Sequence, residues 1–289
     1  MNAIKARLLV LLALLFIAAF VHRIRAQDSP AFRVLVFSKT VAFRHASIEN
    51  GLAAIQALGA ENNFAVDHTE DAALFTDENL AQYQVVIFLN TTGDVLDDAQ
   101  QAAFERFVRA GNGYVGVHAA SDTEYNWPWY GELLGSWFAN HPAIQEATIQ
   151  VVDANHASTS HLPTVWVRTD EWYNFRTALP TSINVLLNLD ESTYSGGQMG
   201  AQHPIAWQHE FDGGRAWYTG MGHTAETYDE PLFRQHLLGG IRWAARQEDA
   251  PAATPTPSGT AVTPPATPTS VATPVTSELE TFFLPLIYQ

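Results

Sequence analysis

Residues 113–124, GYVGVHAASDTE, constrain the fold of this chain more than any other stretch. The run is uncharged up to Val117 and contains tyrosine and valine, which suits a buried central strand of a parallel sheet better than a helix. Directly after it the chain becomes polar and offers His118, Ser121 and Asp122. In open α/β sheets, ligands bind outside the carboxyl ends of the strands. We therefore expect a functional site at the end of this strand.

Strands and helices alternate through the first half of the chain. Ser47 predicts the start of a helix that reaches about residue 58 and ends at Gly59, and Asp97 predicts the N-cap of a helix that Gly111 closes. Three further apolar runs predict strands at residues 32–37, 64–68 and 83–90. This βαβ alternation predicts an α/β domain with a parallel, flavodoxin-like sheet, flanking helices and right-handed crossovers.

The second half is less regular. The pair Asp212-Gly213 between two apolar runs is a strong hairpin signal. The predicted strands are residues 147–152, 164–168, 183–189, 204–211 and 214–218, followed by a final helix over residues 230–245.

Residues 1–26 are typical of a secretory signal peptide. Lys5 and Arg7 precede an uninterrupted apolar run of 14 residues, and cleavage is predicted near Ala26. The run is shorter than the roughly 20 residues that span a bilayer. Arg23 and Arg25 after it are nevertheless unusual for a cleaved signal, so an uncleaved anchor is the alternative. Either interpretation predicts a secreted or cell-surface protein.

The C-terminal end has a different composition. Residues 247–277 are rich in proline, threonine, alanine and serine, which cannot build a core, so we predict a disordered linker or stalk. Residues 278–289 form an apolar tail, FFLPLIY at its centre, which is either a sticky end or a cell-surface or membrane attachment segment. Removing both ends leaves residues 31–246, enough for one sizeable domain.

Charge and cysteine content exclude several functions. Beyond residue 26 the chain carries 11 basic and 30 acidic residues, a net charge of −19, because four of the 15 bases and none of the acids precede that point. Such a surface repels phosphate backbones, so nucleic-acid binding is not expected. The absence of cysteine excludes disulfides, thiolate catalysis and cysteine-type zinc sites.

Several motifs are spread over nearly all of residues 32–245: FRHASI (43–48), GNGYVGVHAASD (111–122), FANHP (138–142), DEWYNF (170–175), HPIAWQHEFDGGRAWYTGMGHT (203–224) and HLLGGIRWA (236–244). Together they resemble those of the trehalose-utilisation (ThuA-like) family. The resemblance implies the flavodoxin-like fold shared with class I glutamine amidotransferases. It also implies a role in the breakdown of disaccharides or their oxidised keto-sugar derivatives, without specifying the reaction.

One position departs from the amidotransferase relatives. They hold a nucleophilic cysteine in the elbow after a Gly-Ile or Gly-Val pair, whereas here Gly116-Val117 is followed by His118. Glutamine hydrolysis through a thioester is therefore excluded. His223 and Glu226 fall near the positions of the relatives' triad histidine and glutamate. Their spacing is His-x-x-Glu rather than His-x-Glu, so those roles are not carried over unchanged.

Polar turns that carry His45, His118 and His223 follow three of the predicted strands, and we expect them to meet at one edge of the parallel sheet. His118 can act as a general base or acid there, because the pKa of an unperturbed histidine lies near neutrality, and Asp122 can orient it or act itself. A buried, hydrogen-bonded structural role is the alternative for the histidines. The predicted catalytic residues are His118, Asp122, His45, His223 and Glu226.

A second group is predicted to bind substrate. Arg44 could clamp an anionic or hydroxyl-rich ligand with its planar guanidinium, or form a structural ion pair instead. Ser121 could also be a nucleophile, but no Gly-x-Ser-x-Gly elbow surrounds it. Tryptophans beside polar motifs suit sugar rings, which have apolar faces and polar rims, unless they serve the core alone. The predicted substrate-binding residues are Arg44, Ser121, His141, Glu171, Tyr173, Asn174, Trp207 and His209.

No cofactor motif is evident. Histidines and carboxylates could hold zinc or another divalent metal, but no compact spacing such as His-Glu-x-x-His is present. We predict an exported protein of carbohydrate catabolism that acts on a small-molecule carbohydrate, a disaccharide or keto-sugar, by acid/base catalysis in a strand-end cleft. The alternative is a sugar-binding or surface scaffold module without turnover. The sequence predicts no oligomeric state.

Overall fold

The computed structural model describes residues 30–248. The predicted signal peptide, nearly all of the predicted linker and the apolar tail lie outside the described residues. Within residues 30–248, no helix has both the length and the apolar character needed to cross a membrane.

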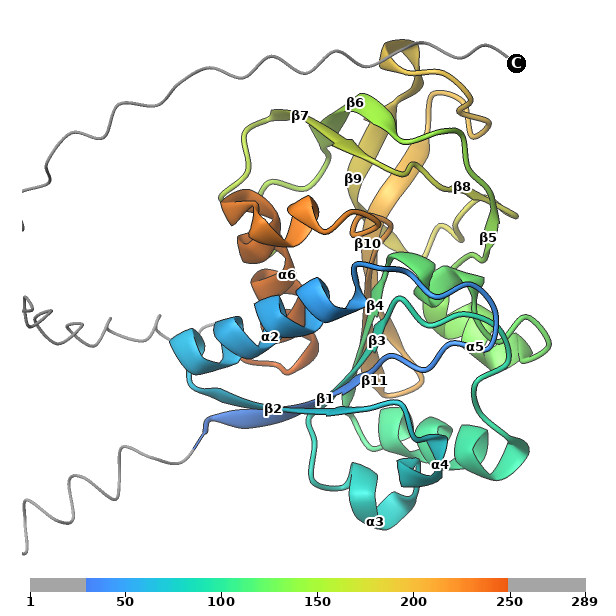
Figure 1. Cartoon of the computed structure of the whole chain (residues 1–289), viewed down its shortest axis with the longest axis vertical. Helices are drawn as coiled ribbons and strands as arrows, with labels where there is room; N and C mark the ends of the chain where they lie inside the picture. The colour runs from blue at the N-terminus through green and yellow to red at the C-terminus, as the bar shows by residue number, and fades with distance from the viewer. Residues whose placement is uncertain (1–29, 249–289) are drawn as a thin grey trace, which may run out of the picture. The chain divides into compact units, whose positions relative to one another are not determined.

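A nine-stranded sheet forms the centre of the domain, in the order β2-β1-β3-β4-β11-β10-β9-β6-β7 (Figure 1). The first five strands of this order are parallel to one another, as predicted. They are β2 (Phe64–Thr69), β1 (Phe32–Phe37), β3 (Val85–Leu89), β4 (Gly113–Val117) and β11 (Gly214–Thr219). Their order, 2-1-3-4-5 along the chain, is that of flavodoxin-like sheets. All residues of β3 and β4 are buried, which explains why these runs lack charge.

The other half of the sheet is antiparallel, so the prediction of a parallel sheet applies to five strands only. The Asp212-Gly213 turn joins β10 to β11 with φ angles of 49° and 94°, and a two-residue connection can join only antiparallel strands. The antiparallel strands are β10 (His203–Phe211), β9 (Asn184–Asp190), β6 (Gln145–Val151) and β7 (Val165–Asp170). A separate two-stranded sheet pairs β5 (Phe138–Asn140) with β8 (Asn174–Phe175).

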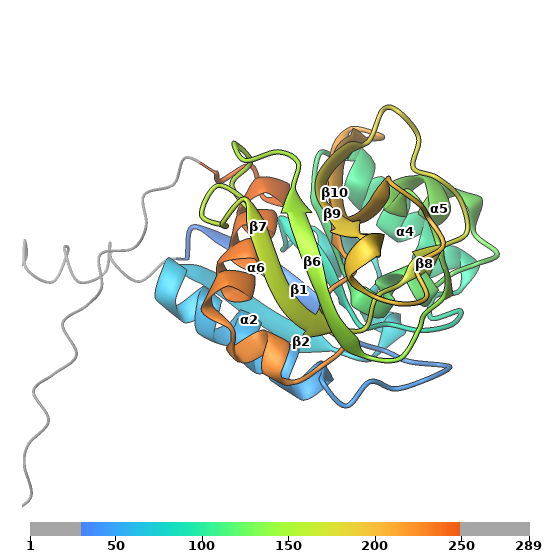
Figure 2. The ribbon, with the colours of Figure 1, turned by 90° about the horizontal axis from the view of Figure 1, so that it is seen from above.

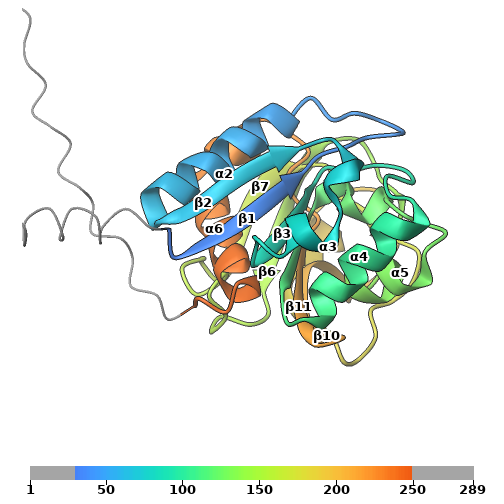
Figure 3. The same cartoon turned by 90° about the horizontal axis from the view of Figure 1, so that it is seen from below.

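Helices cover both faces of the sheet. Helices α2 (Ile48–Asn62) and α6 (Pro231–Ala244) lie on one face (Figures 1 and 3). Helices α3 (Asp77–Leu80), α4 (Asp98–Arg109) and α5 (Pro128–Leu134) lie on the other face. Four short 3₁₀ helices complete the domain: η1 (Ala72–Leu74), η2 (His118–Asp122), η3 (Glu191–Thr193) and η4 (Glu226–Asp229).

The helix termini confirm one prediction and correct another. Asp97 caps α4 by accepting hydrogen bonds from the N–H groups of Ala99 and Gln100, as predicted. Helix α2, however, continues past Gly59 to Asn62, and Asn63 ends it in the left-handed conformation, with φ at 57°. Gly59 is needed for packing instead, because a Cβ there would lie 2.7 Å from the carbonyl oxygen of Phe64.

Ser47 precedes α2 as predicted but does not cap it with its side chain. Its hydroxyl donates to the carbonyl oxygen of Gly222, at 3.1 Å, and so joins the loop after β1 to the loop after β11.

The far edge of the sheet folds back over α6. Figure 2 shows β6 and β7 lying across this helix. The indole of Trp166 on β7 donates to the Glu230 carboxylate at 2.9 Å, and Arg168 donates to the Thr227 hydroxyl at 2.7 Å. The guanidinium of Arg168 also lies 5.3 Å from the centre of the Phe233 ring. The carboxyl end of β7 is thereby brought next to the loop that follows β11.

Two buried histidines, His236 and His156, are expected to make the stability of the fold depend on pH. His236 on α6 donates from Nδ1 to the carbonyl oxygen of Ser158 at 2.7 Å, and its Nε2 has no partner among the described residues. Burial lowers the pKa of His236 to about 3 and that of His156 to about 4. Protonation of either ring in the folded protein would bury a charge that the surroundings do not pair.

We therefore expect the free energy of unfolding to fall as the pH is lowered from about 6.5 towards 4. In this window the unfolded chain binds protons that the folded chain does not, and each such proton changes stability by about 1.4 kcal/mol per pH unit. His236→Asn keeps the donor to Ser158 and removes the titration, so its stability should fall less steeply. Urea unfolding at a series of pH values measures both slopes; equal slopes would contradict the prediction.

Candidate functional site

Loops after four strands bring three histidines and one carboxylate together. His45 follows β1, His118 follows β4, Glu171 follows β7 and His223 follows β11. One ligand-type atom of each residue lies within 4.8 Å of those of the other three, and we call this group the His–Glu cluster. Four of the predicted site residues thus lie side by side, although they are spread along most of the described chain.

The turn after β4 fixes His118 in a single orientation. Its backbone is left-handed, with φ at 48°, a conformation that costs energy in a non-glycine residue and is frequent at functional sites. The ring packs against Tyr173, with 4.1 Å between the ring centres, and Nδ1 lies 2.8 Å from the carbonyl oxygen of Gly220. Because a carbonyl only accepts, Nδ1 carries a proton, and Nε2 is the ring nitrogen that faces the cluster.

The Glu171 carboxylate contacts three histidine side chains. Its Oε2 lies 3.0 Å from Nδ1 of His223 and 3.4 Å from Nε2 of His118, and its Oε1 lies 3.0 Å from Nδ1 of His141. Burial opposes ionisation, but the adjoining rings of His118 and His223 outweigh it and hold the pKa of Glu171 well below its usual range. Burial alone would lower the pKa of His223; the neighbouring Glu171 carboxylate raises it. Glu171 is therefore ionised at neutral pH.

Asp170 positions this group and is a site residue that the sequence analysis missed. The carboxylate is fully buried and accepts the N–H groups of Gly222 at 3.0 Å and His223 at 3.1 Å. It also accepts the hydroxyl of Thr227 at 3.1 Å and lies 3.4 Å from Arg168. One buried carboxylate thus ties the end of β7 to the loop that carries His223. Its only sequence signal is its place at the head of the DEWYNF motif.

A pocket of about 520 Å³ opens above the cluster. Aromatic rings form part of its wall, and the ring of Phe43 is unusually open to solvent, at 64%. Asp122 lies in the wall, where burial raises the pKa of its carboxyl and the Tyr125 hydroxyl donates to it at 2.6 Å. The lining residues are Phe43, His45, Asp122, Phe138, His141, Glu171, Tyr173 and His223. The sequence analysis missed Phe43 and Phe138, although both lie in the quoted motifs.

Seven predicted residues, among them His118 of the cluster, do not line this pocket. Arg44 pairs with Glu49 and Glu70, at 2.8 Å each, which is the structural ion pair named as its alternative. Ser121 is buried and donates to the backbone carbonyl of His118 at 3.2 Å. Glu226 is exposed on η4, one turn beyond His223, because the longer His-x-x-Glu spacing turns it away.

The remaining predicted residues support the fold around the pocket. Asn174 is buried and donates to the Asn140 side chain at 2.8 Å. Trp207 and His209 on β10 donate to the backbone carbonyls of Leu134 and Leu133, at 2.7 and 2.8 Å. Trp207 and His209 alternate on one face of β10, and that face packs on α5 rather than on the cleft. The tryptophans beside polar motifs therefore do not line the pocket, and its aromatic rings are those of phenylalanine and tyrosine.

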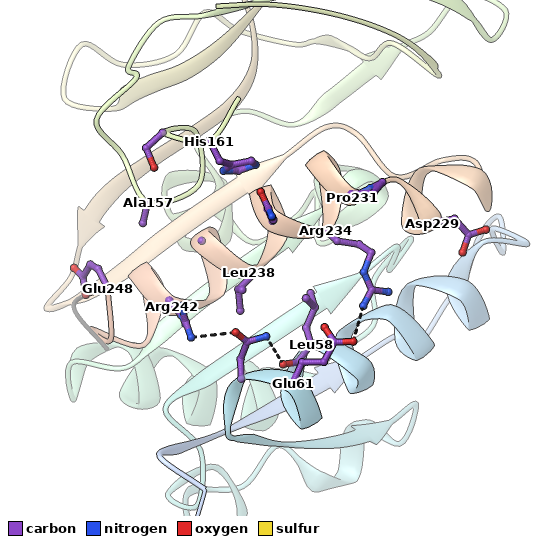
Figure 4. Close-up of a pocket in the computed structure, with 14 residues that line it drawn as sticks. Leu58, Glu61, Ala157, His161, Asp229, Pro231, Arg234, Leu238, Arg242 and Glu248 are labelled. Carbon is purple, nitrogen blue, oxygen red and sulfur yellow. Dashed lines mark hydrogen bonds and ion pairs between the residues drawn. The ribbon is translucent and has the colours of Figure 1, made fainter. Parts of the chain in front are cut away.

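A larger pocket of about 810 Å³ lies elsewhere, between α2, α6 and the loop around Ala157 (Figure 4). Its cationic groups have partners already. Arg234 pairs with Glu61 at 3.4 Å, and Arg242 donates to the Asn62 side chain at 3.1 Å. No cluster of three or more metal-ligating side chains within residues 30–248 lies in its wall. The smaller pocket above the His–Glu cluster is therefore the stronger candidate site.

Comparisons with known proteins agree with this architecture. A family model described as ThuA, trehalose utilisation, matches residues 33–244. A crystal structure of a ThuA-like protein from Bacteroides uniformis is 27% identical, with a TM-score of 0.65, and the match covers 75% of this chain and 92% of that one. A ThuA-like protein from Parabacteroides merdae is 20% identical (TM-score 0.62; coverage 75% and 90%). A cytoplasmic protein from Salmonella typhimurium shares the fold at 11% identity (TM-score 0.54; coverage 73% and 99%). No curated protein was found to match the chain.

The position of Asp170 predicts a large effect on stability. Asp170→Asn keeps only one acceptor oxygen and removes a buried negative charge next to Arg168, so we expect a loss of at least about 2 kcal/mol in the free energy of unfolding. The matched control is Asp67→Asn, which breaks the exposed Arg33–Asp67 pair and should cost less than about 1 kcal/mol. Denaturant unfolding compares the two, and equal costs would refute the role given to Asp170.

Proposed function

The chain belongs to the ThuA family, described as trehalose utilisation, and from this premise we propose that it is an exported enzyme of carbohydrate catabolism. Its substrate is a small carbohydrate, a disaccharide or a keto-sugar derived from one, and it acts by acid/base catalysis in the pocket above the His–Glu cluster. Glutaminase chemistry is excluded, because His118 stands where those enzymes need cysteine.

The observation that carries this proposal is a pair of carboxyl groups with opposite pKa shifts in one pocket. Burial raises the pKa of Asp122, whereas its histidine neighbours hold Glu171 ionised. Environments that separate pKa values in this way are typical of acid/base sites, and here Asp122 is the acid while Glu171 orients the neighbouring histidine His141. Asp122 is thus suited to donate a proton to a departing or carbonyl oxygen of a sugar.

His141 is the best placed base. Its Nδ1 lies 3.0 Å from Oε1 of Glu171 and 2.9 Å from the carbonyl oxygen of Pro142, two groups that only accept. The proton therefore sits on Nδ1, and Nε2 is free to take one from substrate. His141 lines the pocket and its side chain is 42% exposed, whereas His118 is fully buried and does not line it. We therefore assign proton transfer to His141 and Asp122, and to His118 a place in the cluster beneath them.

The pocket wall suits a sugar. The open ring of Phe43 and the partly exposed ring of Phe138 offer apolar surfaces to the C–H face of a pyranose, and Asp122 and His141 can bond its hydroxyls. Burial holds the pKa of Tyr173 far above neutrality, so its hydroxyl remains a donor.

The test is incubation of the purified protein with trehalose, other disaccharides and their 3-keto derivatives, with products followed by mass spectrometry. Conversion of any of them supports the proposal. If every sugar is recovered intact, with and without added divalent metals, the enzyme assignment fails. Tight calorimetric binding of a sugar that is recovered unchanged would support the binding-module alternative instead.

His141 should be needed for turnover but not for folding. We expect His141→Gln to lower kcat by roughly 10²–10⁴ with little change in KM or melting temperature, because it removes a proton acceptor from a half-exposed position. His161→Gln is the matched control: it replaces a half-buried histidine whose Nε2 contacts the carbonyl of Leu232, away from the pocket, and should leave kcat unchanged. Similar kcat values for both variants would rule out His141 as the base.

We expect Phe43 to contribute to substrate binding and not to the chemical step. An aromatic contact is worth about 0.5–1.5 kcal/mol beyond its burial, so Phe43→Ala should raise KM about 2- to 10-fold and leave kcat and the melting temperature nearly unchanged. Val41→Ala, an equally exposed residue of the same loop, is the control and should leave KM unchanged. Steady-state kinetics on the two variants decide whether the exposed ring of Phe43 contacts the sugar.

A further inference from the structure

We infer that the His–Glu cluster is a binding site for one divalent transition-metal ion. His118 Nε2, His223 Nδ1 and Glu171 Oε2 are three of its ligands, and His45 supplies the fourth. This inference goes beyond the proposed function, because it holds whether or not the protein converts a sugar.

The first argument is that three facing ligand atoms need a cation between them. His118 donates its Nδ1 proton to the carbonyl of Gly220, so its Nε2 is the ring atom that faces the cluster. That nitrogen lies 3.4 Å from Oε2 of Glu171 and 3.2 Å from Nδ1 of His223, which in turn lies 3.0 Å from the same oxygen. A single proton bonds one pair of these atoms at a time, whereas a metal ion at the centre binds all three.

The second argument is geometric. A tetrahedral zinc ion with ligands at 2.0–2.1 Å separates each pair of ligand atoms by about 3.3 Å. The three distances between His118 Nε2, His223 Nδ1 and Glu171 Oε2 are 3.0, 3.2 and 3.4 Å. They form one face of such a tetrahedron without any movement of the backbone. His45 is 4% exposed and has a ring nitrogen within 4.8 Å of the other three atoms, so it can supply the fourth ligand after a movement of its side chain.

The third argument is that groups outside the cluster hold the ligands in place. Metal-binding histidines almost always give their second N–H to a carbonyl or carboxylate, which fixes the tautomer and the ring, and His118 does so to Gly220. Asp170 holds the backbone of His223, and the Ser47 hydroxyl anchors the same loop through the carbonyl of Gly222. Hydrogen bonds to residues outside the cluster therefore already hold His118 and His223 in place in the absence of a metal.

The donor set selects the ion. Three imidazoles and one carboxylate suit zinc and its first-row neighbours, whereas magnesium and calcium require oxygen ligands. His45, Glu171 and His223 also line the pocket, so an oxygen of a bound molecule could reach the ion as a fifth ligand. The four ligands come from loops after four different strands, which is why no compact motif announces the site.

The test uses the full chain, stripped of metal with a chelator and dialysed. Calorimetric titration with ZnCl₂ should show one zinc per chain, elemental analysis after reloading and dialysis should find one equivalent, and the melting temperature should rise on zinc addition. MgCl₂ should give no binding. The Co²⁺-loaded protein should show the visible absorption of a tetrahedral site. None of these readings requires a substrate, so they stand apart from the test of sugar turnover.

Variants identify the ligands. Glu171→Gln and His223→Ala should each weaken zinc binding by more than about 100-fold, beyond the 10- to 100-fold that loss of an outer partner causes. His156→Asn, a buried histidine outside the cluster, should bind zinc like the wild type, and circular dichroism of the metal-free proteins checks folding. If His223→Ala does not fold, Glu171→Gln, which has the same shape, decides alone.

Three results would overturn the inference: no stoichiometric zinc in the wild type, unchanged zinc affinity in the cluster variants, or magnesium binding as strong as zinc binding. In the first two cases a proton, rather than a metal, would be the cation that holds His118 and Glu171 together.

Discussion

The site depends on one buried carboxylate, that of Asp170. It accepts N–H groups from Gly222 and His223 and a hydroxyl from Thr227, while Arg168 supplies the opposite charge. These bonds join the last strand of the sheet order, β7, to the loop after its central strand β11, although three strands separate them in the sheet. A charge this deep is tolerated only when it is fully bonded, and its bonds in turn allow only one position for the two loops.

Glu171 is the next residue along the chain, and the bonds of Asp170 set its position. With the backbone of residues 170 and 171 anchored, the Glu171 carboxylate reaches His118 and His223 with one oxygen and His141 with the other. The left-handed turn at His118 meets it from β4, where a tight corner is held by packing against Tyr173. The anchored Glu171 carboxylate and the strained turn at His118 therefore both place polar atoms in fixed positions at the floor of a pocket that has aromatic walls.

Much of the fold could be predicted from local patterns. The buried runs of β1, β3 and β4, the Asp97 cap and the Asp212-Gly213 hairpin are encoded by neighbours in the sequence, and the structure confirms each of them. The convergence of His45, His118 and His223 also follows from the rule that parallel strands end at one edge. Local patterns did not decide which element a strand face meets: Trp207 and His209 share a face, and only packing places this face against α5.

The sequence by itself determined the parallel half of the α/β sheet, its family and the three loops that carry the histidines, because strand periodicity, caps and turn residues act over a few positions. Only the tertiary structure decided which residues meet. The fold-back of β7 over α6 brings Asp170 and Glu171 to the histidines, and it depends on contacts of Trp166 and Arg168 with residues some 60 positions later. The same packing leaves Glu226 in solvent and Arg44 in ion pairs. Such contacts are set by the shapes and charges of distant surfaces, which no local pattern records.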